Sequence, residues 1–181
     1  MFERTPTMST NPTTHPQTVD APAGSWHLEP ADSTVEFTGR HFFFLPVRGS
    51  LPVRSGRAEL AADGTLAGLD ATVGVAGFES GDPRRDTAVR GPRFLDAERH
   101  PELRFTGERL TTGPGVTGLL EVKGRRTPVT FTVDELTTDG DRATVRATAR
   151  VDRHACGVGA MRGLVGAGLL VRVRAVFVRR S

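Results

Sequence analysis

Several residue types and patterns that mark secreted or membrane-spanning proteins are scarce in this chain. Cys156 is the only cysteine among the 181 residues, so no intramolecular disulfide can form and no oxidising compartment is required. No apolar run approaches the roughly 18 to 20 residues that a membrane-spanning helix needs. The first 24 residues lack the apolar stretch of a secretory signal. These absences predict a soluble, cytoplasmic protein without stable membrane insertion.

Lysine and tyrosine are also nearly missing. Lys123 is the only lysine, so arginine supplies almost all of the positive charge behind the formal net charge of +3. Clustered arginines can mark a nucleic-acid-binding face, which usually carries stacking aromatic residues as well. In residues 142–153 and 172–180 the arginines alternate with apolar residues. Phe131 and Phe177 fall at the apolar positions of their strands, on the face opposite to the polar residues. The pattern therefore favours solvated strand faces over a nucleic-acid partner.

Alternating apolar and polar residues dominate the chain from about Thr34 onward. Such alternation is typical of half-buried strands, and it predicts eight of them, at residues 34–39, 57–62, 69–75, 103–106, 116–124, 128–136, 142–151 and 169–178. The 21 glycines and 12 prolines supply turn residues between these segments. Regularly spaced short strands predict an antiparallel sandwich or barrel.

The N-terminal residues differ in composition from the rest. Residues 1–24 are rich in Thr and Pro, and order is expected to begin near Ser25 and Trp26. The predicted organisation is a disordered leader over residues 1–24 and one domain over residues 25–181.

The alternation stops between residues 82 and 102, where charged residues and prolines gather. Asp82 suits a helix N-cap and Pro83 the first helical position, while Gly91 and Pro92 would end the helix. We therefore expect one or two short helices across one end of the sheet, with the Arg85-Asp86 pair anchoring them. Phe94 and Leu95, which follow the helix, are expected to plug that end.

Reactive residue types are present without a catalytic arrangement. Cys156 lies near His154, but neighbouring positions on an extended strand point apart, so a buried, inert thiol is expected. The five histidines show no metal-ligand spacing. The carboxylates at residues 82, 86, 96 and 98 are explained by capping and ion pairs, and Arg153 is expected to pair with a carboxylate. The sequence thus predicts no enzyme activity and no metal site.

The order of certain residues resembles a known family, the YceI-like proteins, over residues 26–178. The first matching residues are Trp26, Ser33, Val35, Phe37, His41 and Gly49. The interrupted region adds Arg85, Asp86, Phe94, Asp96, Pro101 and Phe105, and later matches are the segment 118–131, Arg153 and Gly157. This family is described as polyisoprenoid-binding proteins with a lipocalin-like barrel.

The resemblance implies an all-β fold, an antiparallel lipocalin-like barrel of about eight strands with one or two short helices capping an end. It also implies non-enzymatic binding or carriage of an apolar lipid, a polyisoprenoid or an isoprenoid quinone, with no other cofactor. The residues expected to contact the lipid are Phe37, His41, Phe42, Phe44, Val73, Val75, Phe94, Phe105, Phe131, Val173 and Phe177. Among them His41, beside the aromatic run, is the expected polar contact.

The residues alone are compatible with two alternatives for the interior of the domain. Small inward residues such as Ala71, Ala147 and Ala175 could leave an apolar void that admits a ligand. The same residues could instead form a close-packed core, which would make the protein an interaction or stress-response module without a bound lipid. Strand edges or the aromatic run at residues 41–44 could also support a homodimer.

Overall fold

The computed structural model describes residues 19–42, 44–110 and 115–180, and these form ten strands of one sheet. The strands are β1 (Gly24–Leu28), β2 (Thr34–His41), β3 (Leu45–Leu51), β4 (Val53–Leu60), β5 (Leu66–Gly74), β6 (Glu102–Leu110), β7 (Gly115–Val122), β8 (Arg125–Asp139), β9 (Arg142–Asp152) and β10 (Gly168–Arg180). The described helices are α1 (Pro83–Arg90) and the 3₁₀ turns η1 (Pro30–Asp32) and η2 (Val75–Gly77). None of them is long and apolar enough to cross a membrane.

β10 closes the sheet because one of its edges pairs with two strands in succession. Residues 170–174 pair with β2, and residues 177–180 pair with β1. β1 also pairs with β4, so β1 and β4 to β10 form a closed antiparallel ring of eight strands. The predicted antiparallel barrel of about eight strands is confirmed, and the sandwich alternative is wrong.

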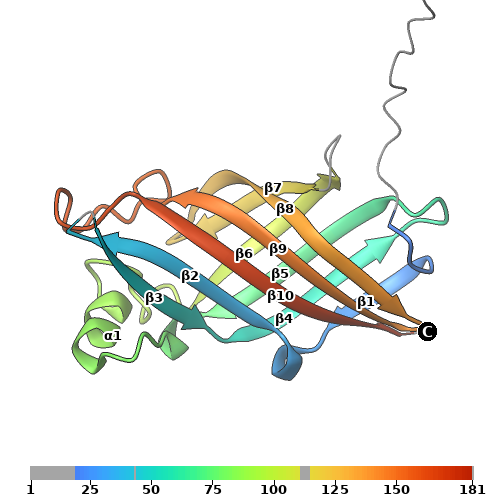
Figure 1. The fold of residues 1–181 in the computed structure, drawn as a ribbon, viewed down its shortest axis with the longest axis horizontal. Coiled ribbons are helices and arrows are strands. Elements are labelled where there is room, and N and C mark those ends of the chain that lie inside the picture. Colours follow the sequence, from blue (N-terminus) through green and yellow to red (C-terminus); the bar gives the residue numbers. More distant parts are fainter. Residues whose placement is uncertain (1–18, 43, 111–114, 181) are drawn as a thin grey trace, which may run out of the picture.

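The β2–β3 hairpin enlarges one end of the barrel, called here the wide end (Figure 1). The outer edge of β3 pairs with no other strand among the described residues. Its one backbone bridge there joins Ser50 to Glu79. The segment 75–101, which contains α1, lies beside β3 at this end (Figure 1). The interruption of the strand pattern therefore corresponds to a helical segment that completes the wall where strands do not.

The boundaries of α1 follow the predicted capping residues. The side chain of Asp82 accepts hydrogen bonds from the backbone N–H groups of Arg84 and Arg85, at 3.0 and 3.2 Å. At the other end, the N–H of Gly91 donates to the carbonyl of Thr87. These caps satisfy backbone groups that an eight-residue helix cannot satisfy internally.

Polar contacts tie α1 to residues 78–80, the segment that precedes it and that forms a bridge with β3. Asp86 is 9% exposed and accepts hydrogen bonds from the backbone N–H and the hydroxyl of Ser80, at 2.9 and 2.6 Å. Arg85 donates to the same hydroxyl at 3.4 Å, and Arg90 donates to the carbonyl of Phe78. The expected anchoring by Arg85 and Asp86 is therefore present, with Ser80 as the common partner.

Two strands, β1 and β3, are absent from the sequence prediction. β1 has only five residues, and β3 contains Pro46 and Gly49, which are unfavourable inside a sheet. Pro46 is tolerated because β3 pairs along one side only, with β2. The prediction that Val75 continues an inward-facing strand is also wrong, because β5 ends at Gly74 and η2 begins at Val75.

Two glycines allow β6 and β7 to approach closely. Gly107 and Gly118 are paired partners, and a Cβ on Gly118 would lie 2.2 Å from the carbonyl oxygen of Thr106. We expect Gly118→Ala to lower the free energy of unfolding by about 2–3 kcal/mol, because backbone must shift to admit the methyl group. Denaturant titration measures this change.

The matched control is Gly68→Ala on β5, which pairs with the other edge of β6. A Cβ at Gly68 meets no atom within 4 Å, so its free energy of unfolding should change by less than about 0.5 kcal/mol. Equal midpoints for both variants would contradict the close-approach explanation for Gly118.

Candidate functional site

A cavity of about 590 Å³ occupies the barrel interior. Its lining shows the predicted period of two, and on β10 it consists of Leu169, Val171, Val173, Ala175 and Phe177. At about 3.3 Å per residue these five positions span about 26 Å of strand, or about 20 Å along the axis of a barrel with ordinary strand tilt. The cavity is therefore elongated and lies parallel to the barrel.

The narrow end of the cavity is closed by packed side chains. Trp26 is 2% exposed, and its indole N–H donates to the carbonyl of Pro22 at 3.0 Å. It belongs to a buried cluster with Leu28, Ala143, Ala175 and Phe177. Of this cluster, Leu28, Ala175 and Phe177 also line the cavity, so the cluster forms its floor.

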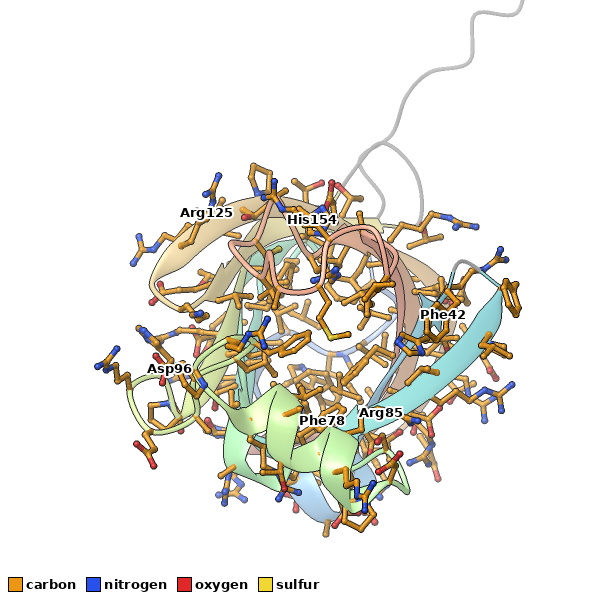
Figure 2. All side chains as sticks on the ribbon, turned by 90° about the vertical axis from the view of Figure 1, so that its left-hand side faces the viewer. Phe42, Phe78, Arg85, Asp96, Arg125 and His154 are labelled. Carbon is orange, nitrogen blue, oxygen red and sulfur yellow. The ribbon has the colours of Figure 1, made fainter. Side chains whose placement is uncertain are left out.

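The wide end of the cavity reaches the surface. Met161, which is 38% exposed, and Arg40, which is also exposed, belong to the cavity lining. The inner side of α1 contributes Arg85, Ala88 and Val89. Figure 2 looks toward this end, with α1 and Arg85 below and Phe42 at the right. A ligand could enter here with its long axis along the barrel.

The lining is almost entirely apolar, and its charged or imidazole side chains come mainly from the wide end. His41 and Arg40 stand at the end of β2, Asp82 is the N-cap of α1, and Arg85 belongs to α1. His41 packs against Phe42 with ring centroids 4.2 Å apart. An apolar tail inside and a polar group at the opening match this distribution of polarity.

Arg153 is the main buried charge near the opening. It is 4% exposed and donates to the backbone carbonyls of Val158, Ala160, Val165 and Gly166 at 2.8 to 2.9 Å. The expectation that it pairs with a carboxylate is wrong, because four carbonyl oxygens take all of its described hydrogen bonds. Burial, with repulsion from Arg162, lowers the pKa of Arg153, yet a guanidinium stays protonated in any ordinary solution.

The residues predicted to contact a ligand fall into two groups. Eight of them line the cavity together: Phe37, His41, Val73, Phe94, Phe105, Phe131, Val173 and Phe177. Phe42 and Phe44 are instead 46% and 73% exposed at the wide end, and Val75 is fully buried outside the lining. Phe94 and Leu95, predicted to plug the end, are half-buried side chains of the lining.

Sequence reasoning missed two kinds of lining residue. Leu103, Leu120 and Val171 follow the alternation of their strands, which groups them with other inward residues, but they are not among the expected ligand contacts. Val89, Met161 and Val165 lie outside the strands, and no periodic pattern points to them. Among the residues that the structure describes, no group of three or more His, Cys, Asp or Glu side chains could hold a metal ion.

Cys156 is 2% exposed and lies in a buried cluster with Val122, Val129 and Val158. Burial raises the pKa of its thiol, which disfavours the reactive thiolate. We expect iodoacetamide at pH 8 to alkylate the native protein at least about tenfold more slowly than the denatured protein. Mass spectrometry over time measures both rates. Equal rates would instead indicate an accessible thiol and would support an enzyme that uses Cys156 as a nucleophile.

The comparisons with known proteins agree with this architecture. Residues 26–177 match the family model of the YceI-like domain. The crystal structure of Burkholderia cenocepacia BcnA is similar with a TM-score of 0.67 at 21% identity, covering 82% of this chain and 98% of that one. A polyisoprenoid binding domain from Saccharophagus degradans has a TM-score of 0.66 at 11% identity, covering 86% and 98%.

A third similar structure is the Campylobacter jejuni YCEI protein, with a TM-score of 0.51 at 16% identity over 72% of this chain and 84% of that one. At such identities the likeness concerns the fold alone. No curated protein sequence matches the chain. The family model nevertheless matches most of the chain, and the closed barrel has the same fold as these structures. The chain belongs to the YceI-like family.

Proposed function

We propose that this protein binds an apolar lipid, a polyisoprenoid or an isoprenoid quinone, inside its barrel and carries it without covalent chemistry. The observation that supports this most is the elongated apolar cavity of about 590 Å³. Its volume lies within the range of about 300–1,000 Å³ that is usual for small-ligand sites. The name of the Saccharophagus degradans relative, a polyisoprenoid binding domain, also supports a chain-like ligand.

The hydrophobic effect supplies the driving force for such binding. Burying about 300 Å² of hydrocarbon would contribute about 7 kcal/mol at 25 cal/mol per Å². Association and ordering costs offset part of this gain. A cavity that already exists in the folded chain reduces the ordering cost on the protein side, because strand pairing closes the eight-stranded ring around it.

The orientation of the lipid follows from the polarity of the lining. The floor at the narrow end is formed by Leu28, Ala175 and Phe177, whereas Arg40, His41 and Arg85 stand at the wide end. We infer that the tail points to the floor and that the head group lies near His41 and Arg85. A buried head group at the floor would have no hydrogen-bonding side chain there.

The alternative is an interaction or stress-response module that carries no lipid. The cavity disfavours it, since a module without a ligand gains stability from a filled core. The cytoplasm as compartment, a homodimer, the lack of a nucleic-acid partner and the lack of enzyme activity remain predictions from the sequence.

Native mass spectrometry of the protein purified from lipid-containing cells tests the proposal. We expect an additional mass that organic extraction releases and that fragmentation identifies as an isoprenoid chain. A protein that carries only its own mass, and that takes up no prenyl quinone added during refolding, would favour the ligand-free module.

A further inference from the structure

The large apolar side chains that are exposed in the described part of the chain all lie at the wide end. Phe42 and Phe44 belong to the β2–β3 turn and Leu45 begins β3, while Met161 and Leu164 belong to the loop between β9 and β10. Their exposed fractions range from 38% to 73%. We call these five residues the rim patch; in Figure 2 Phe42 marks its position at the edge of the opening.

The two loops of the rim patch form one continuous surface. The N–H of Phe42 donates to the carbonyl of Leu164 at 2.7 Å, and the N–H of Gly166 donates to the carbonyl of Arg40 at 2.9 Å. His41 and Val165 form an antiparallel bridge between the loops. Phe42 and Met161 adopt positive φ angles of 50° and 53°, a conformation uncommon outside glycine. Backbone contacts therefore hold the apolar side chains outward in a fixed arrangement.

The two segments that carry the rim patch have charge of one sign. Residues 37–49 and 153–168 contain no Asp or Glu. They contain Arg40 and Arg162, which are exposed, and no ion pair in the described residues involves either of them. Exposed apolar and aromatic side chains together with unpaired arginines match the chemistry of an anionic lipid surface.

The rim patch is also continuous with the cavity. Arg40, His41, Met161 and Val165 belong to the cavity lining, and they lie among or beside the patch residues. A bilayer in contact with the patch would face the opening directly, so an apolar tail could pass between membrane and barrel without crossing water. A protein partner would instead need a complementary groove, and the patch consists of protruding loop residues.

We propose that the rim patch docks the wide end of the barrel onto an anionic lipid bilayer. The purpose of this docking, exchange of the bound lipid, rests on the proposed function, whereas the docking itself rests only on the surface residues. The docking is peripheral: Phe44 and Leu45 enter the interface while Arg40 and Arg162 contact the lipid phosphates.

Co-sedimentation of the full chain with vesicles tests the proposal. Vesicles of phosphatidylcholine with phosphatidylglycerol should bind the protein, and vesicles of phosphatidylcholine alone should bind it at least about tenfold more weakly, since two arginines contribute about fivefold each. The double variant Phe44→Ser/Leu45→Ser should lower the partition coefficient at least about tenfold, because it removes the apolar contact. Added salt should release the wild-type protein from the anionic vesicles.

Matched arginine variants separate docking from general charge attraction. Arg40→Gln/Arg162→Gln should reduce binding to anionic vesicles strongly. Arg150→Gln/Arg172→Gln removes the same charge from the outer wall, where both residues are exposed, and should change binding less than about twofold. Equal losses in the two variants would overturn the proposal, and so would a wild-type protein that stays in the supernatant.

Two further readouts identify the cause of a failure. Phe44 and Leu45 do not line the cavity, so their double variant should still carry lipid in native mass spectrometry. A protein that binds vesicles but carries no lipid inside its barrel would contradict the proposed function and would still support docking. A wild-type dimer that the Phe44→Ser/Leu45→Ser variant converts to a monomer, without vesicle binding, would overturn docking and assign the patch to a second copy of the chain.

Discussion

Substitution of Ala147 by phenylalanine is expected to exclude lipid from the barrel while leaving the barrel folded. Ala147 lines the cavity in the middle of β9, and its strand partners Val133 and Val173 also line it. The phenyl ring can enter the existing cavity, so the strain is smaller than in a filled core. Loss of about 100 Å² of ligand contact would weaken binding about seventyfold at 25 cal/mol per Å².

The amount of lipid that co-purifies with Ala147→Phe, relative to wild type, measures this effect. Arg146→Phe is the matched control, because Arg146 precedes Ala147 on the same strand and its side chain is 61% exposed on the outer face. The control should retain the wild-type amount of lipid, and circular dichroism should be unchanged in both variants. A folded Ala147→Phe protein with full lipid content would place the ligand outside the barrel.

Loss of the Arg153 side chain is expected to lower the free energy of unfolding strongly. The guanidinium joins four backbone carbonyls of the loop between β9 and β10, at residues 158, 160, 165 and 166. Arg153→Met leaves these oxygens without their partner. The expected cost is about 3–5 kcal/mol, which corresponds to a fall in Tm of about 10 °C for a domain of this size.

Thermal unfolding and hydrogen exchange test this prediction together. Arg150→Met, three residues earlier on an exposed position of β9, should change the free energy of unfolding by less than about 0.5 kcal/mol. Arg153→Lys should recover little stability, because one ammonium group cannot reach four separated carbonyls. Unchanged Tm and unchanged amide exchange across residues 157–166 in Arg153→Met would show that other contacts hold the loop.

The rim patch and Arg153 are connected through the same loop. Arg153 binds the carbonyls of Ala160 and Val165, which flank Met161 and Leu164 of the patch. The buried guanidinium therefore holds the apolar side chains of this loop in their exposed position. None of residues 159–166 of this loop is buried, and polar bonds hold this part, which is usual for segments that bind ligands or surfaces.

The sequence by itself determined eight of the ten strands and the direction in which most of their side chains point. Along β10 the inward set of Val171, Val173 and Phe177 follows from the alternation, because successive residues of an extended chain face opposite sides. The start of α1 at Asp82 and Pro83 is equally local, since a cap needs only its own side chain and the next backbone N–H groups. The resemblance to the YceI-like family, in turn, depended on the order of residues along the chain.

Only the tertiary structure decided which features make a site. β3 contains Pro46 and becomes a strand because β2 offers it an edge. Arg153 finds carbonyls rather than a carboxylate because the loop that it begins folds back over its side chain. The cavity exists because the inward side chains of the barrel wall do not fill the space that barrel closure encloses. That balance of volumes depends on all the strands at once, so no local pattern of residues contains it.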